Sequence, residues 1–222
     1  MDRVIWHDVE CGAYAADLPL WRELAAAEAP AGPVLDLGAG TGRVALDLAR
    51  RGVEVHAVDV DEALLAALRE RARGLPIRTH TADVRELALD VRVPLALAPM
   101  QTVQLLGGRA GRARMLAAVR RHLVPGGLLA CAVAEEIDTF EPGAFAPLPD
   151  MREIDGIVYA SRPVAIRAED DAHVIERIRE RVDRDGTHHC GEDRVRLDRL
   201  TAAALEAEAA ACGYRPEPRR SI

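Results

Sequence analysis

The chain has 222 residues, a formal net charge of −7 at pH 7 and only 3% aromatic residues. The length suits one core with an excursion, and the acidic charge lacks the basic footprint that nucleic-acid backbones require. Few aromatic side chains are present to stack on bases. No segment approaches the roughly 20 consecutive apolar residues of a membrane helix. We therefore expect a soluble, cytoplasmic protein without nucleic-acid or membrane partners.

The sequence also limits the reactive side chains. All 29 basic residues are arginines, so a lysine base or Schiff base is excluded. The four cysteines, Cys11, Cys131, Cys190 and Cys212, are far apart and form no C-x-x-C pair. We expect free thiols, no disulfide framework and no metal site.

Strand and helix patterns alternate through the first half of the chain. A helix is predicted over 17–29, before the breaker Pro-Ala-Gly-Pro. Further helices are predicted at 43–51, 62–73 and 112–123, and buried strands at 34–37, 53–58, 76–81, 93–98 and 128–134. This alternation indicates an α/β fold with a mostly parallel sheet covered by helices on both faces.

The second half has a different pattern. Residues 135–150 are rich in proline and acid and predict an irregular loop. Strands are expected at 156–166 and 173–182 and around Val195 and Leu197, with a hairpin turn at Asp185-Gly186. The spacing of Val174, Ile178 and Val182 also suits a helix, but the β-branched content favours a strand. Thr201 is expected to cap a helix over 202–212, before a possible last strand at 215–222.

The most informative segment is Val34-Leu35-Asp36-Leu37-Gly38-Ala39-Gly40-Thr41-Gly42-Arg43, a strand, a glycine turn and a helix start. Glycine allows positive φ angles and close approach of a ligand, and open α/β sheets bind ligands at the carboxyl ends of their strands. Dinucleotide sites use G-x-G-x-x-G, whereas here the pattern is G-x-G-x-G and Arg43 fills the place of the third glycine. Asp36 is a poor neighbour for pyrophosphate, so a cationic ligand is favoured.

This segment resembles the first motif of class I S-adenosylmethionine-dependent methyltransferases of the small-molecule type. Three further segments extend the resemblance: Val55–Asp61 is similar to the second motif, Ala82-Asp83-Val84 to the third, and Leu123–Leu128 to the turn into strand five. The resemblance implies the Rossmann-like methyltransferase fold, S-adenosyl-L-methionine as cofactor and methyl transfer by in-line displacement.

The resemblance also implies roles for individual residues. Asp36 and the turn Gly38, Ala39, Gly40 and Gly42 would surround the methionine part of the cofactor. Asp59 would accept hydrogen bonds from the ribose hydroxyls. The adenine would meet Asp83, Val60 and the main chain of Val84. Tyr14, in a segment similar to a lid helix, would contact the cofactor carboxylate, and Pro99 would lie beside the cofactor at the end of strand four.

The methyl acceptor is expected to be a small molecule bound near Met100 and Gln101. Families that methylate exocyclic or amide nitrogens carry (N/D)-P-P-(Y/F) at the place where this chain has Ala98-Pro99-Met100-Gln101. Positioning and desolvation are expected to supply most of the catalysis, so an obvious base is not required. If a base is used, the candidates are His7, Glu135, His188 and His189.

The expected organisation is a cofactor-binding core over 1–134 with an N-terminal lid helix within 1–29, an excursion over 135–200, and a last helix and strand over 201–222. The excursion would cover the substrate or join two subunits. The family sheet has seven strands, so 215–222 replaces the seventh, a partner chain fills its place, or the chain is truncated. A homodimer is therefore possible. The alternative function is a non-catalytic, S-adenosylmethionine-binding regulatory or partner subunit.

Overall fold

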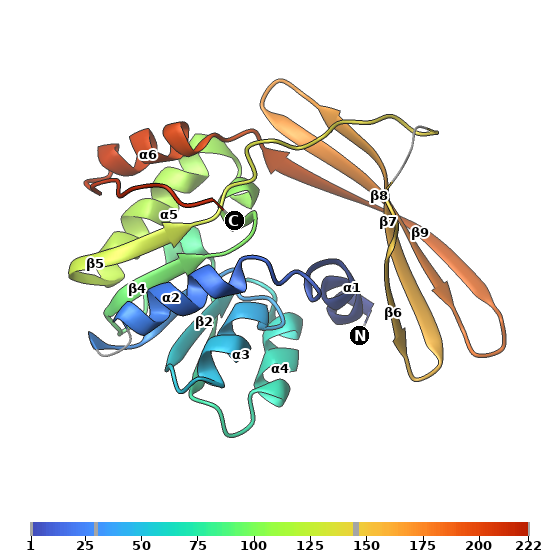
Figure 1. Ribbon diagram of the computed structural model, residues 1–222, viewed down its shortest axis with the longest axis horizontal. Helices are drawn as coiled ribbons and strands as arrows, with labels where there is room; N and C mark the ends of the chain where they lie inside the picture. Colours follow the sequence, from blue (N-terminus) through green and yellow to red (C-terminus); the bar gives the residue numbers. More distant parts are fainter. Residues whose placement is uncertain (1, 29–30, 144–146, 222) are drawn as a thin grey trace. The chain divides into compact units, whose positions relative to one another are not determined.

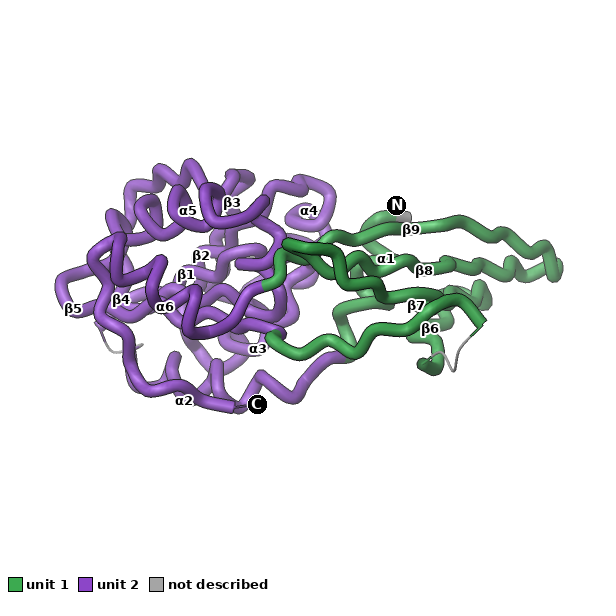
Figure 2. Tube along the Cα trace, turned by 90° about the horizontal axis from the view of Figure 1, so that it is seen from above, with its two compact units in different colours: residues 1–13, 135–199 green, residues 14–134, 200–222 purple. Residues whose placement is uncertain are grey.

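Figure 1 shows the computed structural model of the chain, which describes residues 2–28, 31–143 and 147–221. The chain folds into two compact units, coloured separately in Figure 2. One unit, here called the α/β unit, contains residues 14–134 and 200–222. The other, here called the antiparallel unit, contains residues 1–13 and 135–199. Each unit is described by itself.

The α/β unit is built on a five-stranded parallel sheet of order β3-β2-β1-β4-β5 (Figure 1). Its strands are β1 Val34–Leu37, β2 Val55–Asp59, β3 Ile77–Thr81, β4 Val93–Ala98 and β5 Leu123–Cys131. Its α-helices are α2 Leu18–Glu28, α3 Arg43–Ala49, α4 Glu62–Arg71, α5 Gly108–His122 and α6 Ala202–Ala211, with 3-10 turns η2 Val84–Glu86 and η3 Thr102–Leu105. This architecture confirms the predicted Rossmann-like fold.

Helices cover both faces of this sheet. Leu35 and Leu37 of β1 belong to a core cluster that includes side chains of α5 and α6. Val34 of the same strand belongs to a second cluster with α2, α3 and α4. Successive residues of a strand point to opposite faces, so the apolar run of β1 is buried on both sides.

The boundaries of several elements differ from the prediction. β5 begins at Leu123, which pairs with Val93 before an irregularity in the register. α5 begins at Gly108, four residues before the predicted start. The strand expected at 215–222 is not formed in the described residues 215–221. Pro216 and Pro218 lack the N–H groups that a ladder needs, and Arg220 instead forms an ion pair with Glu23 of α2.

The antiparallel unit contains a four-stranded sheet of order β6-β7-β8-β9. Its elements are α1 Asp2–Cys11, β6 Asp150–Ile154, β7 Ile157–Ala168, β8 Ala172–Val182 and β9 His188–Asp198. The strand assignment for 173–182 is confirmed, whereas β6 and α1 were not predicted. α1 packs on the sheet through Ile5 and Val9, and Glu10 accepts hydrogen bonds from Ser161 and Arg179.

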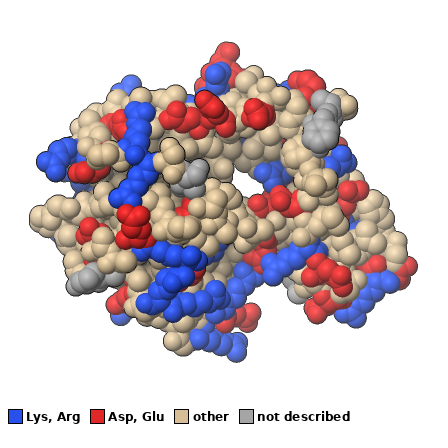
Figure 3. Space-filling model, viewed as in Figure 1, with Lys and Arg blue, Asp and Glu red and all other residues tan. Residues whose placement is uncertain are grey.

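The surface of the molecule carries both signs of charge. Arginine and acidic side chains are interspersed on the face shown in Figure 3. Many of them form ion pairs, as between Arg196 and Glu169 or between Arg219 and Glu206. Among the helices that the structure describes, none has the length and apolarity needed to cross a membrane.

Candidate functional site

The glycine turn links β1 to α3 at the carboxyl end of the sheet. Gly38, Gly40 and Gly42 have φ angles of 70°, 54° and 96°, all in the left-handed region that favours glycine. A Cβ at Gly38 would lie 2.8 Å from Oγ1 of Thr102, which follows β4. The turn is therefore packed against the end of the neighbouring strand, and a side chain at Gly38 would have to displace Thr102.

Asp59 ends β2 and ties the glycine turn to the adjacent strand. Its Oδ2 accepts a hydrogen bond from the Gly40 amide at 2.8 Å, and its Oδ1 accepts one from the Asp61 amide at 2.9 Å. Asp61 is the N-cap of α4, as predicted, and its side chain accepts from the amides of Ala63 and Leu64. The two nearby acids thus have different structural roles: Asp61 caps a helix, and Asp59 borders the turn.

Asp36 is a buried carboxylate at the start of the same turn. It is 1% exposed, and neither of its oxygens has a hydrogen-bond partner within the described residues. Burial raises its pKa to about 7, while the positive charge of Arg43 opposes that rise. A buried acid without a hydrogen-bond partner is costly, and strongly shifted acids of this kind concentrate at functional sites.

Tyr14 lies beside the first residue of α3. Its side chain is 42% exposed, and the guanidinium of Arg43 lies 5.3 Å from its ring centroid. Arg43 also binds the buried Asp17 with two hydrogen bonds. Our sequence reasoning named Tyr14 and missed the Asp17–Arg43 pair. The sequence did offer one signal for this pair: Arg43 stands where dinucleotide-binding sites have their third glycine.

The ends of β2 and β3 carry the residues expected near an adenine ring. Val60, directly after β2, is 67% exposed, whereas Val84 is buried in η2. Asp83 caps η2 by accepting from the Arg85 amide at 2.8 Å, and the Arg85 guanidinium lies 2.6 Å from its other oxygen. The side-chain hydrogen bond from Arg85 lowers the pKa of Asp83. Asp83 is therefore already partnered.

The end of β4 carries the residues expected to line an acceptor. Pro99 is buried, and its carbonyl accepts a hydrogen bond from the Thr102 hydroxyl at 2.8 Å. Met100 has a φ of 52°, which is unusual for a residue with a side chain and is typical of functional sites. Gln101, half-buried, is the N-cap of η3. Pro99, Met100 and Gln101 thus follow β4 as Gly38 follows the paired β1.

The four candidate bases all belong to the antiparallel unit. His7 is in α1, and Glu135 is the first residue of the excursion. On β9, Nε2 of His188 lies 3.3 Å from Glu180, and Nε2 of His189 lies 2.9 Å from Asp183. His189 also lines a hollow together with Trp6, Tyr159 and Arg179. A catalytic role for any of the four stays a prediction.

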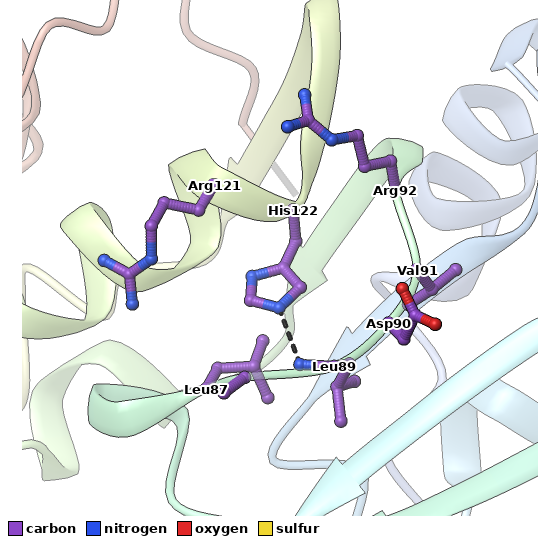
Figure 4. Close-up of a pocket in the computed structure, with 8 residues that line it drawn as sticks. Leu87, Leu89, Asp90, Val91, Arg92, Arg121 and His122 are labelled. Carbon is purple, nitrogen blue, oxygen red and sulfur yellow. Dashed lines mark hydrogen bonds between the residues drawn. The ribbon is translucent and has the colours of Figure 1, made fainter.

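A separate hollow of the α/β unit lies at the opposite end of β4, where residues 87–92 precede the strand (Figure 4). His122 lines it, and Nε2 of this histidine accepts a hydrogen bond from the Leu89 amide at 2.9 Å. Nδ1 lies 2.8 Å from the Ala118 carbonyl and donates to it. Nε2 thus holds the loop and Nδ1 fixes the ring to α5. The residues that we expect to bind the cofactor lie at the carboxyl end of the sheet instead.

The chemistry of the glycine-turn site suits a ligand with positive charge. Asp36 and Asp59 border the turn, and the charge of Arg43 is balanced by Asp17. A pyrophosphate would meet uncompensated carboxylates, whereas an ammonium or sulfonium group would supply the partner that Asp36 lacks. The open backbone of the glycine turn gives such a ligand close access.

Comparison with known proteins finds similarity to methyltransferases in both sequence and structure. The profile of the methyltransferase domain family matches residues 34–127. A cypemycin N-terminal methyltransferase from Streptomyces sp is 30% identical over 112 residues, which are 50% of this chain and 43% of that protein. The chain spans less than half the length of the curated relatives it matches.

Solved structures resemble this chain over most of its length. The crystal structure of Streptomyces venezuelae DesVI has a TM-score of 0.78 at 21% identity, covering 96% of this chain and 89% of that one. The glycopeptide N-methyltransferase MtfA, complexed with S-adenosyl-L-homocysteine, has a TM-score of 0.58 at 25% identity, covering 90% of this chain and 78% of that one. The first of these likenesses concerns the fold alone.

Proposed function

We propose that the chain, whose residues 34–127 match the profile of the methyltransferase domain family, binds S-adenosylmethionine and transfers its methyl group to a small-molecule acceptor. The buried carboxylate of Asp36, without a hydrogen-bond partner beside the glycine turn, is the observation that carries this proposal. A ligand ammonium at the turn would satisfy it. The complex of MtfA with S-adenosyl-L-homocysteine supports the same ligand class.

The residues at the carboxyl ends of β1 and β2 would hold the cofactor. Asp36 and the glycine turn would bind the methionine part, and Asp59 would accept hydrogen bonds from the ribose hydroxyls. The exposed side chain of Val60 would cover one face of the adenine. Asp83 is held by Arg85, so its main-chain neighbour Val84 is the better candidate for the adenine edge. Tyr14 and Pro99 would border the cofactor.

When bound, the cofactor supplies a methyl group that its sulfonium has already activated. The chain would contribute position, by fixing the cofactor against the buried Asp36, and exclusion of water from the reacting groups. Met100 and Gln101, at the end of β4, would orient the acceptor. The left-handed backbone of Met100 (φ 52°) would hold its side chain in a fixed direction.

A small molecule is the acceptor class that the sequence favours. The net charge of −7 opposes a nucleic-acid acceptor, and residues 98–101 lack the motif of enzymes that methylate exocyclic nitrogens. Relatives include a cypemycin N-terminal methyltransferase and a glycopeptide N-methyltransferase, so small amines are the first acceptors to test. Acceptors methylated on oxygen or carbon are tested next, in the same assay.

The proposal is tested by release of S-adenosylhomocysteine from S-adenosylmethionine in the presence of pooled small amines, alcohols and carboxylates. Acceptor-dependent turnover by the wild type, abolished in Asp36→Ala, is the expected result. Tight binding of S-adenosylmethionine without turnover on any pool would support the alternative of a non-catalytic binding subunit. Absence of both binding and turnover in the folded chain would refute the proposal.

A further inference from the structure

Arg43 forms a buried clamp directly beside the glycine turn. It is the first residue of α3, immediately after Gly42. Its two terminal nitrogens lie 2.5 and 2.7 Å from the two oxygens of Asp17. The two side chains are 9% and 1% exposed. Such a two-pronged, buried pair fixes geometry more strongly than an exposed ion pair.

The clamp holds the segment before α2 on the turn. The Nη1 group of Arg43 also donates to the Tyr14 carbonyl at 3.0 Å, and the guanidinium lies 5.3 Å from the Tyr14 ring centroid. The Asp17 carboxylate in turn accepts from the indole N–H of Trp21 at 2.7 Å. Through one guanidinium, residues 14–21 are thus fixed to the start of α3.

The same guanidinium acts on Asp36. Among the charged groups that influence this carboxylate, Arg43 favours its ionised form, whereas Asp59 and Asp17 disfavour it. Arg43 has the largest effect of the three. Because Asp36 is buried, bulk water does not screen the charge of Arg43, and the backbone of Ala45 favours the ionised carboxyl in the same direction.

We propose that Arg43 is a positioning residue of the cofactor site, which fixes Tyr14 and Asp17 beside the glycine turn and keeps Asp36 available as a carboxylate for the ligand's ammonium group. This inference rests on the proposed function. It adds a role that the motif residues alone do not give: a residue that needs no contact with the ligand opposes the effect of burial and favours the ionised form of Asp36.

The inference has a directional consequence for binding. A cationic ligand binds the ionised form of Asp36, so its affinity rises with pH through the titration of that carboxyl, whose pKa is about 7. Without Arg43, Asp36 loses its main favourable charge while Asp59 remains nearby. The pH at which binding reaches half of its maximum then moves upward by about one unit.

The first test needs no ligand. The wild-type chain is labelled with ¹³C at its aspartate carboxyls and titrated by NMR, and the Asp36 signal is identified by its loss in Asp36→Asn. In Arg43→Met the Asp36 pKa is expected to rise by about one unit, and in Arg43→Lys, which keeps the charge, by much less. The double variant Asp17→Asn/Arg43→Met avoids leaving a buried charge unpaired and is expected to show the same direction.

The second test is calorimetric binding of S-adenosylmethionine from about pH 6 to 8.5, a range that spans the Asp36 titration. The wild type is expected to bind more tightly as pH rises, with the profile of Arg43→Met displaced to higher pH. Arg43→Lys should weaken binding at every pH without that displacement, because it loses the two-pronged contact only.

The outcomes separate the two claims. A wild type that does not bind S-adenosylmethionine refutes the proposed function, whatever the NMR titration shows. An Asp36 pKa that is equal in the wild type, Arg43→Met and the double variant overturns the role of Arg43. The role of Arg43 is also overturned if the pH profile of binding in Arg43→Met is not displaced along the pH axis from that of the wild type. Circular dichroism of each variant confirms that the compared chains are folded.

Discussion

The amide of Gly40 donates a hydrogen bond to Oδ2 of Asp59 across 2.8 Å, and this bond joins the turn after β1 to the end of β2. The other oxygen of Asp59 accepts from the Asp61 amide. A carboxylate has about four acceptor positions, so Asp59 retains the capacity to accept two further hydrogen bonds. It can therefore shape the turn and bind a pair of ligand hydroxyls at once.

Replacement of Gly42 by alanine is expected to destabilise the α/β unit strongly. Gly42 has a φ of 96°, and an added Cβ would lie 2.2 Å from Cδ1 of the fully buried Leu68. Strain and overpacking together predict a loss of roughly 2–4 kcal/mol in the free energy of unfolding, measured by urea denaturation.

Gly52→Ala is the matched control for this substitution. Its φ of +85° is also left-handed, but nothing lies within 4 Å of the added Cβ. It should lose only about 1 kcal/mol, the cost of the backbone conformation. Equal losses in the two variants would show that the contact between the turn and α4 is not tight.

Asp36→Asn is expected to be more stable than the wild type at neutral pH. The carboxyl titrates near 3.8 in the unfolded chain and near 7 in the folded one, so between these values the folded state binds more protons. The stability contributed by the protonated carboxyl is therefore lost as pH rises from about 4 to 7. Asp36→Asn has no carboxyl at this position to titrate, so it does not lose stability in this way as pH rises.

The stability gain of Asp36→Asn should grow across that pH range and level off above it, reaching on the order of 2–4 kcal/mol. Urea denaturation at several pH values measures it, and the same variant should bind S-adenosylmethionine less tightly. A gain that is independent of pH would mean that the Asp36 carboxyl is not buried as described.

The stacked pair His56 and His80 predicts the opposite pH dependence. Nε2 of His80 lies 3.0 Å from Nδ1 of His56, and burial lowers the pKa of both rings below 6.5. Below that pH the unfolded chain binds more protons, so the pair's contribution to stability is lost as pH falls.

His80→Gln keeps a donor for His56 but removes one titrating ring. Between about pH 7.5 and 5, the wild type is expected to lose more stability than this variant. Asp36 acts in the opposite sense over the same pH range, but it does so equally in both chains. Its effect therefore cancels when the free energy of unfolding of one chain is subtracted from that of the other. If the two urea-denaturation profiles stay parallel, His80 does not titrate abnormally.

Local sequence patterns predicted the parallel sheet closely. β1 and β4 were predicted residue for residue, because an apolar run bounded by glycine or proline is a strong signal for a buried strand. The caps Asp61 and Thr201 were also predicted correctly, since their hydrogen bonds are made within three residues.

Long-range contacts were harder to predict. α1 is stabilised by Glu10, which meets Ser161 and Arg179 more than 150 residues later in the chain. The Asp17–Arg43 clamp joins residues 26 apart, so the unusual position of Arg43 was visible in the sequence but its partner Asp17 was not. The strand expected at 215–222 failed because Pro216 and Pro218 cannot donate to a ladder, and the segment has almost no apolar side chains to bury.

Calorimetric titration with S-adenosylmethionine tests the central claim most directly, on the wild type, Asp59→Ala and Asp61→Ala. Asp61→Ala is the matched control, because it removes a helix cap worth about 1 kcal/mol two residues away and leaves the site intact. We predict one-to-one binding by the wild type and Asp61→Ala, weakened about 100-fold in Asp59→Ala through the loss of two charge-assisted hydrogen bonds. A folded wild type that does not bind, or equal affinity in all three chains, would contradict the account.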